Sequence, residues 1–435
     1  MTYHLGVDLG STTSKAVLVD EQERVVGRGI TNTRANYDVA VEVARREALV
    51  DAMLGLVAPR AGGDPEAIAV AFRVEQDLRR LGRLRELCRT VAATIPGEGA
   101  RLGPAMDTIL AKLQDEADAL FAGAQRDRGS FFRDLVGARF YATAEASFER
   151  LGVDFERLTG VYDRAILTVE NEVEDLAFDR TVRAALDRAE VEPSAARAEA
   201  EREAGRLARK PLAVTSVVGT GYGRARLPFP KEQLRSEILC HGLGAHAMFP
   251  GTRTVLDIGG QDTKAIQVDP RGLVTSFQMN DRCAAGCGRY LGYIADELNL
   301  GLHELGPLAL QATKPCKINS TCTVFAGNEL RDLLSVGERR ENILAGLHRA
   351  IVKRAMSLIA RSGGAHEELT FTGGVARNPA VVDALRDLVA RHYGPRTINI
   401  HTDSIYTGAL GAALFALRGT PAVDLPVKEC QGCTD

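Results

Sequence analysis

The sequence predicts an α/β protein in which two lobes face each other across a cleft and a large helical insertion interrupts the first lobe. Three observations lead to this prediction. A strand–turn–strand unit at the N-terminus recurs after residue 250, paired glycines near residue 373 separate a strand from a helix, and a long glycine-poor stretch follows the first unit. Clefts between lobes are common ligand sites.

The first unit is an expected antiparallel meander of three short strands. Residues 4–9 and 15–19 are β-rich runs on either side of the turn GSTTS, and residues 23–30 supply a third strand. In VDLGSTTSK, Asp8 ends a strand, and a glycine followed by small hydroxyl residues leaves backbone amides uncovered. Such a turn is able to hold phosphate oxygens, with Asp8 facing a hydrated Mg²⁺, although alone it is also typical of an ordinary hairpin. The phosphate-binding candidates here are Gly10, Ser11, Thr12, Thr13 and Lys15.

The segment of residues 31–210 is predicted to be a helical insertion. It holds only 13 of the 43 glycines and contains the patterns AFRVEQDLRRLGRLRELCRTV, PAMDTILAKLQDEADALF and VYDRAILTVENEVEDLAF. Apolar residues recur in these patterns at spacings of three and four, which is typical of amphipathic helices. We interpret the charge runs between them as the solvated faces of those helices.

A second turn, LDIGGQDTK, repeats the order of acid, apolar residue, glycine, polar residues, Thr and Lys. Asp257 corresponds to Asp8, and Gln261 or Asp262 is a candidate to orient an attacking water, as polar groups do in other NTPases. The further phosphate-binding candidates of this turn are Gly259, Gly260 and Thr263. Neither turn is a GxxxxGK[ST] loop or a GxGxxG fingerprint, so the sequence predicts neither a P-loop nor a dinucleotide-binding fold.

A third element, LTFTGGVARNPAVVDAL, places Gly373 and Gly374 between a strand and a helix. Paired glycines at such a position let the backbone approach a flat or charged ligand closely.

The three elements together resemble the actin, Hsp70 and sugar kinase superfamily of ATPases. The resemblance implies duplicated ribonuclease H-like lobes with ATP or ADP between them, two aspartate turns around Mg²⁺ and the phosphates, and the paired glycines at the adenosine. The chain then divides into parts of the ATPase lobes (1–30 and 211–270), the insertion (31–210), cluster-bearing helices (271–345), and an adenosine-side lobe with the C-terminal tail (346–435).

Eight cysteines in 435 residues are too few for a disulfide framework, and four of them fall between residues 283 and 322. In NDRCAAGCGRYL and NSTCTVFAGNEL, polar residues are placed to cap helices that begin beside Cys283 and Cys322. Helix N-termini favour thiolates. Because iron–sulfur clusters generally need four thiolates, two subunits would have to share one [4Fe-4S] cluster. The alternative is that both thiols are buried or incidental.

The segments DRCAAG and STCTVFA behind an ATPase core resemble the BadF/BadG/BcrA/BcrD family, which includes activators of 2-hydroxyacyl-CoA dehydratases and ATPase subunits of ATP-dependent benzoyl-CoA reductase. The resemblance covers residues 1–30 and about 212–420. It implies that Cys283 and Cys322 are cluster ligands, with the other two thiolates from a paralogous ATPase subunit or an identical chain.

The long insertion and the following VVGTGYGR favour a benzoyl-CoA reductase component within this family. On that interpretation, ATP hydrolysis drives low-potential electron transfer from ferredoxin to cluster-containing partner subunits, which bind the substrate and reduce its aromatic ring. A homodimeric dehydratase activator, a kinase of the same fold and an ATP-controlled binding protein stay open.

The other clustered or paired cysteines have no assigned role. Cys287 lies one helical turn after Cys283 and is a candidate to tune or replace a ligand, whereas Cys316 is a weaker candidate. Cys430 and Cys433 form a tail CxxC without a second pair for zinc, so mobile thiols are expected there.

Charge and hydropathy point away from nucleic acid and membrane. The formal net charge is -3, which gives no basic surface for a polyanion. The longest stretch near the C-terminus without Asp, Glu, Lys or Arg, residues 404–417, is shorter than the roughly 18 apolar residues that a membrane span needs. The N-terminus does not resemble a secretory signal, so we expect a cytoplasmic protein.

Overall fold

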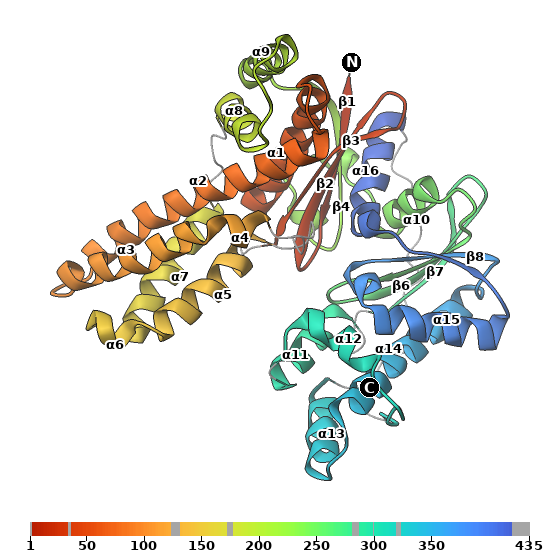
Figure 1. Cartoon of the computed structure of the whole chain (residues 1–435). Helices are drawn as coiled ribbons and strands as arrows, with labels where there is room; N and C mark the ends of the chain where they lie inside the picture. The colour runs from red at the N-terminus through yellow and green to blue at the C-terminus, as the bar shows by residue number, and fades with distance from the viewer. Residues whose placement is uncertain are drawn as a thin grey trace. The chain divides into compact units, whose positions relative to one another are not determined.

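The computed structural model describes residues 2–33, 36–122, 131–171, 177–280, 287–298, 300–318 and 323–419. It divides into two compact units (Figure 1). Residues 1–25 and 214–435 form one unit, called here the two-sheet unit, and residues 26–213 form the other, called the helical unit.

Two sheets with the same internal arrangement underlie the fold. Their strand orders are β3-β2-β1-β4 and β7-β6-β5-β8-β9. In each sheet the first strand of a hairpin pairs antiparallel with the next strand and parallel with a later one, as β1 does with β2 and β4, and β5 with β6 and β8. The strands are β1 (Tyr3–Leu9), β2 (Thr13–Asp20), β3 (Val25–Asn32), β4 (Val214–Thr220), β5 (Thr254–Ile258), β6 (Thr263–Val268), β7 (Val274–Asn280), β8 (Glu368–Thr372) and β9 (Thr397–Asn399).

This topology confirms the predicted repetition of the meander. Every residue of β1 and of β5 is buried, as expected for strands at the centre of a sheet that is covered on both faces. Because β1 is parallel to β4 and β5 is parallel to β8, the C-terminal ends of each pair lie at the same edge of their sheet.

The helices of the two-sheet unit cover these sheets. They are α10 (Glu237–Met248), α11 (Gly288–Leu298), α12 (Leu305–Ala309), α13 (Thr323–Ser335), α14 (Arg340–Ser362), α15 (Pro379–Tyr393) and α16 (Thr407–Arg418), with short 3-10 turns η2 (Arg224–Arg226), η3 (Lys231–Gln233), η4 (Leu302–Glu304), η5 (Gly374–Arg377) and η6 (Thr402–Tyr406). Helices α10 and α16 lie side by side, as Figure 1 shows. They approach so closely that a Cβ atom on Gly411 would lie 1.9 Å from the carbonyl oxygen of Cys240.

Besides residues 26–32 of β3, the helical unit contains α1 (Tyr37–Val57), η1 (Ala58–Arg60), α2 (Pro65–Ala93), α3 (Gly99–Asp115), α4 (Ala117–Ala122), α5 (Phe132–Glu145), α6 (Phe148–Leu151), α7 (Phe155–Asn171), α8 (Phe178–Arg188) and α9 (Ala195–Arg209). The longest of them, α2, begins where Asp64 accepts hydrogen bonds from the backbone of Glu66 and Ala67, with Pro65 in the first turn. Leu81 and Leu84 of α2 pack in one apolar core with α3, α5 and α7, while Phe72 packs in a second core with α1, α8 and α9. α2 therefore joins the two cores of this unit.

One of the three predicted helices is interrupted in the structure, and the last part of another falls on residues that the structure does not describe. The helix predicted over residues 104–121 is interrupted at Glu116, which separates α3 from α4. Of the helix predicted over residues 161–178, α7 covers residues 161–171, and residues 172–176 lie outside the described part of the chain. Hydrophobic periodicity continues from α3 into α4 because both helices pack in the same core.

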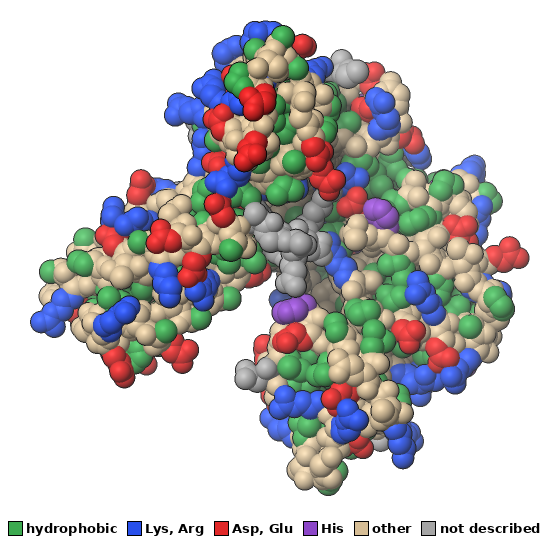
Figure 2. Space-filling model, viewed as in Figure 1, with side chains coloured by type: hydrophobic (Ala, Val, Ile, Leu, Met, Phe, Trp, Pro, Cys, Tyr) green, Lys and Arg blue, Asp and Glu red, His purple; other side chains and the backbone are tan. Residues whose placement is uncertain are grey.

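Charged side chains of both signs are spread over the helical unit (Figure 2). Many of them pair, as Arg80 does with Glu47 at 2.6 Å and Arg188 with Glu75 at 2.7 Å. Mixed charges on helix surfaces agree with the interpretation of the charge runs as solvated faces. Over the residues that the structure describes, no helix is both long enough and apolar enough to span a bilayer.

Candidate functional site

The two predicted phosphate turns have the same hairpin register. Asp8 lies opposite Lys15 across β1 and β2, and Asp257 lies opposite Lys264 across β5 and β6. Each aspartate sits one residue before the end of a buried central strand, so its carboxylate is buried at the point where the chain turns. The sequence repeat therefore corresponds to a repeat of geometry.

In the first turn, the side chain of Asp8 is only 4% exposed. Its Oδ2 atom lies 3.8 Å from Nζ of Lys15. Its Oδ1 atom is buried and has no hydrogen-bond partner among the described residues. A desolvated carboxylate oxygen without a partner is unfavourable, so this atom is suited to a cation or to a water bound by one.

In the second turn, Asp257 is surrounded by partners. Thr372 donates a hydrogen bond to its Oδ1 at 2.7 Å, and Nζ of Lys264 lies 3.3 Å from its Oδ2. Burial by itself would raise the pKa of Asp257, but His241, Lys264 and the hydrogen bond from Thr372 outweigh it and hold the pKa well below its usual value. Asp257 is thus ionised and fixed in orientation.

Lys264 is a fully buried ammonium that contacts three carboxylates. Besides Asp257, its Nζ lies 2.7 Å from Oδ1 of Asp262 and 2.9 Å from Oε1 of Glu237. Burial would lower the pKa of Lys264, but the three carboxylates raise it well above its usual value. Burial raises the pKa of Asp262, although Lys264 opposes that shift. The sequence pattern singled out Asp262 but gave no role to Lys264.

Helix α10 contributes two residues that the sequence pattern did not indicate, Glu237 and His241. Nδ1 of His241 lies 3.5 Å from Oδ1 of Asp257, and its Nε2 lies 3.8 Å from Glu237. Burial would raise the pKa of Glu237, but Lys264 and His241 lower it below its usual value. The sequence did contain a signal for these two residues: a Glu and a His four positions apart at the start of an apolar helix lie on one face of that helix.

The two turns meet within the two-sheet unit. A Cβ atom on Gly260 of the second turn would lie 2.2 Å from Oγ1 of Thr12 in the first. A Cβ atom on Gly408, in the first turn of α16, would lie 2.8 Å from both Oδ2 of Asp8 and Nε2 of His241. The predicted phosphate-binding residues of both hairpins therefore converge on one site, and glycines keep the space beside them clear.

The paired glycines adjoin the same site. Gly373 follows β8 with φ of 86°, and a Cβ atom there would lie 2.2 Å from the carbonyl oxygen of Ile258 at the end of β5. Gly374 begins η5, and a Cβ atom on it would have no neighbour within 4 Å. Gly373 therefore packs against the second phosphate turn, and the space beside Gly374 is open.

The start of α11 is bonded to the second phosphate turn. The backbone amides of Gly288 and Arg289 donate to the carbonyl oxygens of Gly259 and Gly260 at 2.9 Å and 2.8 Å. Both cluster candidates, Cys283 and Cys322, lie outside the described residues. α11 begins at Gly288, later than the predicted helix start beside Cys283, whereas α13 begins at Thr323, directly after Cys322.

The remaining cysteines differ in their surroundings. Cys287 is buried in the apolar core with α11 and α14, and burial raises the pKa of its thiol. Cys316 is half-buried, and burial together with nearby Glu338 raises the pKa of its thiol. Cys430 and Cys433 lie outside the described residues. Over the described part of the chain, no three His, Cys, Asp or Glu side chains are arranged to hold a metal ion by themselves.

The sequence model of the BadF/BadG/BcrA/BcrD ATPase family matches residues 5–416. The chain is 43% identical over 203 residues to the activator of lactoyl-CoA dehydratase from Anaerotignum propionicum, covering 47% of this chain and 76% of that protein. It is 42% identical over 203 residues to the (R)-2-hydroxyglutaryl-CoA dehydratase activating ATPase from Acidaminococcus fermentans, covering 46% and 75%. It is 34% identical over 202 residues to one of the subunits of benzoyl-CoA reductase from Thauera aromatica, covering 46% and 71%.

Two solved structures share the fold. Component A of the Acidaminococcus fermentans (R)-2-hydroxyglutaryl-CoA dehydratase superposes with a TM-score of 0.55 at 23% identity, covering 96% of this chain and 99% of that one. The activator of the 2-hydroxyisocaproyl-CoA dehydratase from Clostridium difficile, solved with ADPNP, gives a TM-score of 0.51 at 23% identity, covering 96% and 95%. Together with the repeated sheet topology, these matches confirm the predicted actin, Hsp70 and sugar kinase-like fold class.

Proposed function

Because the chain belongs to the BadF/BadG/BcrA/BcrD ATPase family, we propose that it hydrolyses ATP to drive electron transfer through a [4Fe-4S] cluster shared with a second subunit. The observation that carries this proposal is the pair of backbone hydrogen bonds between the second phosphate turn and the start of α11. They tie the expected nucleotide site to the start of α11, which follows Cys283 in the chain by five residues.

The nucleotide half of the proposal rests on the convergent turns. The small residues Ser11, Thr12 and Thr13 would present amides and hydroxyls to the phosphates, and Gly374 would border the adenosine. Asp8 fits a hydrated Mg²⁺ because its Oδ1 atom is buried without a partner among the described residues and glycines leave room beside it. When bound, Mg²⁺ would supply charge neutralisation for the phosphates.

Hydrolysis requires a residue that orients water. Asp262 is paired with Lys264 at 2.7 Å, so its carboxylate is committed to holding that cation. Gln261 is only partly buried and precedes this pair in the turn. We therefore assign the orientation of the attacking water to Gln261, and a supporting electrostatic role to Asp262.

The cluster half rests on where the cysteines fall in the chain. Cys322 directly precedes α13, where amides at the helix N-terminus favour a ligand of negative charge. Cys283 lies five residues before α11, whose first two amides donate to the second phosphate turn. Two such thiolates from each of two subunits would complete the four ligands of a [4Fe-4S] cluster, which stores and passes single electrons. A phosphate turn that shifts on hydrolysis would move the amides of Gly288 and Arg289 with it and so change the setting of the cysteine segment.

The electron acceptor is a partner protein that acts on a CoA ester. The two relatives named as dehydratase activators align at higher identity than the benzoyl-CoA reductase relative, which favours activation of a 2-hydroxyacyl-CoA dehydratase by a dimer of this chain. The 34% identity to the Thauera aromatica reductase protein supports ring reduction of benzoyl-CoA, with a paralogous ATPase subunit, as the second candidate. In both cases a ferredoxin is the proposed donor, and the reducing cytoplasm is the proposed compartment.

Purification under exclusion of oxygen tests the cluster. We expect a brown protein with about four irons per two chains, and loss of the visible absorbance in Cys283→Ala and Cys322→Ala. Cys287→Ala is the matched control, since Cys287 is buried in the apolar core and should leave the absorbance unchanged. A colourless wild-type protein that phosphorylates a metabolite would establish a kinase instead.

The identity of the partner is tested by co-purification from the native source under the same conditions. A dimer of this chain that supports a 2-hydroxyacyl-CoA dehydratase agrees with the first candidate. A complex with a paralogue and two further cluster proteins that reduces benzoyl-CoA would establish the second.

A further inference from the structure

The segment VVGTGYGR, which ends at Arg224, has no role in the site described so far. Its first half belongs to β4, the strand that runs parallel to β1. Thr220, the last residue of β4, is in register with Asp8 of the first phosphate turn. Because parallel neighbours end at the same edge of a sheet, the chain after Thr220 leaves the sheet beside that turn.

Two glycines pack the segment against the end of β1. Gly221 has φ of 99°, and a Cβ atom there would lie 2.5 Å from both Oδ1 of Asp8 and the carbonyl oxygen of Leu9. The amide of Gly223 donates to the same carbonyl oxygen at 3.0 Å. Between the two glycines, Tyr222 is 68% exposed. Bare backbone, and not a side chain, therefore makes the contact with the first phosphate turn.

The other end of the segment is fixed on β4. Leu227 is buried, and a Cβ atom on Gly219 would lie 2.3 Å from its Cδ1 atom. Between these two anchors, the exposed Arg224 begins η2. Its Nη1 atom donates to the carbonyl oxygen of Gly221 at 3.3 Å, so the side chain turns back toward the first phosphate turn. Standard bond lengths then place Nη1 within about 10 Å of Oδ1 of Asp8.

The lysines of the two phosphate turns are already paired with carboxylates. Nζ of Lys264 contacts three of them, and Nζ of Lys15 lies 3.8 Å from Asp8. Among the residues that the structure describes, no carboxylate pairs with Arg224, and its side chain has the carbonyl oxygen of Gly221 as acceptor. Most of the five N–H groups of this guanidinium are thus open to a ligand there.

We propose that Arg224 binds the phosphates of the nucleotide directly. A planar guanidinium matches two phosphate oxygens at once, and its charge is not neutralised by a carboxylate of the described chain. The inference rests on the proposed ATPase function. It gives a role to the segment VVGTGYGR, in which the glycines bring the backbone to the first turn and Arg224 supplies the cation.

Calorimetric titration with ADP and with adenosine, both with Mg²⁺ and protein purified under exclusion of oxygen, tests this role. We expect Arg224→Gln to weaken ADP binding by about tenfold to a hundredfold, the usual effect of a hydrogen bond to a charged group. Adenosine has no phosphate, so its affinity should change by less than about twofold. Arg224→Lys should lose less ADP affinity than Arg224→Gln, because it keeps the charge but not the fork.

Arg271→Gln is the matched control. Its side chain is 79% exposed and pairs with Asp269 in the turn after β6, at the opposite end of that strand from the second phosphate turn. Removing this charge should leave the ADP affinity unchanged. All three variants alter exposed side chains and should melt at the wild-type temperature.

Wild-type ADP affinity in Arg224→Gln would overturn the inference and leave the ATPase function standing. An equal loss of ADP and adenosine binding would also overturn it, because that result assigns Arg224 to the shape of the segment and not to the phosphates. A wild-type protein that does not bind ADP would overturn the proposed function and this inference together.

Discussion

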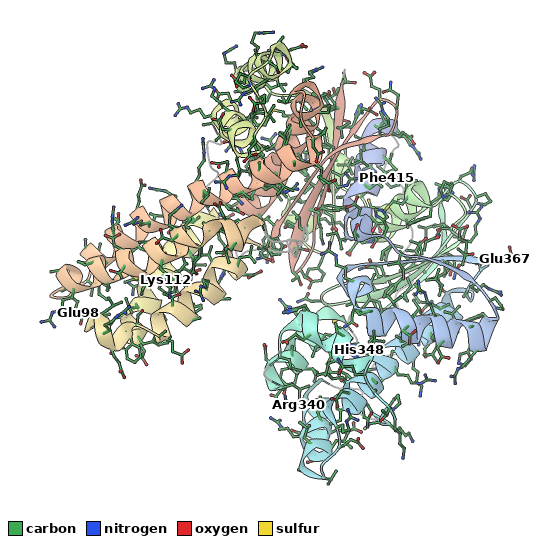
Figure 3. The ribbon with its side chains drawn as sticks, viewed as in Figure 1. Glu98, Lys112, Arg340, His348, Glu367 and Phe415 are labelled. Atoms are coloured by element: carbon green, nitrogen blue, oxygen red, sulfur yellow. The ribbon has the colours of Figure 1, made fainter. Side chains whose placement is uncertain are left out.

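The buried side chain of His348 should make the free energy of unfolding of the two-sheet unit depend on pH. The side chain lies on α14 (Figure 3) and is 1% exposed. Its Nδ1 atom donates to the carbonyl oxygen of Leu344 at 2.6 Å, which requires a proton on Nδ1. Its Nε2 atom must then accept the hydrogen bond from Nδ2 of Asn378 at 2.9 Å, so the imidazole is neutral in the folded protein.

The magnitude follows from the two protonation equilibria. Burial lowers the pKa of His348 from 6.5 to about 4, against the opposing hydrogen bond to Leu344. Because the folded pKa lies below the unfolded one, the unfolded chain binds the proton more readily, and stability is lost as the pH falls from about 6.5 to about 4. The expected loss is about 2 kcal/mol between pH 7 and pH 5, and about 3 kcal/mol once the pH is below 4.

Denaturant unfolding of wild type and His348→Gln at matched pH values measures this contribution. The glutamine amide is able to donate to Leu344 and to accept from Asn378, and it does not titrate. We expect the free energy of unfolding of wild type to fall by about 2 kcal/mol more than that of His348→Gln as the pH is lowered from 7 to 5. Parallel pH profiles would show that His348 is not buried in the neutral form and would refute the reasoning.

Two further substitutions test the packing of the site. Lys264→Met should destabilise the protein by about 3–5 kcal/mol, because it leaves three carboxylates without their buried cation. Lys15→Met, which removes one longer ion pair, should cost about 1 kcal/mol or less. Similar losses of the two variants in chemical denaturation would contradict this difference between the two lysines. Gly411→Ala should lower the free energy of unfolding by about 1–3 kcal/mol, because its Cβ would lie 1.9 Å from the carbonyl oxygen of Cys240. Gly292→Ala on α11 is the control: its Cβ would have no neighbour within 4 Å, so it should raise the free energy of unfolding by up to about 1 kcal/mol. A Gly411→Ala protein as stable as wild type in thermal melts would show that α10 and α16 are not held at this separation.

The comparison of sequence and structure is clearest at the two hairpins. The pattern of acid, glycine, Thr and Lys was sufficient to predict both turns and the strands around them, because hairpin register follows from local chain chemistry. The same pattern gave no reason to distinguish Asp8 from Asp257, since both are followed by a lysine seven positions later. Periodicity also predicted the helical unit but ran one helix through the interruption at Glu116, because α3 and α4 face the same core.

By itself, then, the sequence determined the two repeated hairpins and the helical insertion, which depend on residues close together in the chain. Only the tertiary structure decided that Glu237 and His241 of α10 join the second turn, and that α11 is bonded to it. Those contacts arise where parallel crossovers bring distant segments to the end of one strand. Because water is excluded at the end of that strand, the charged groups buried there must neutralise one another. The local sequence does not specify which distant charged groups come together.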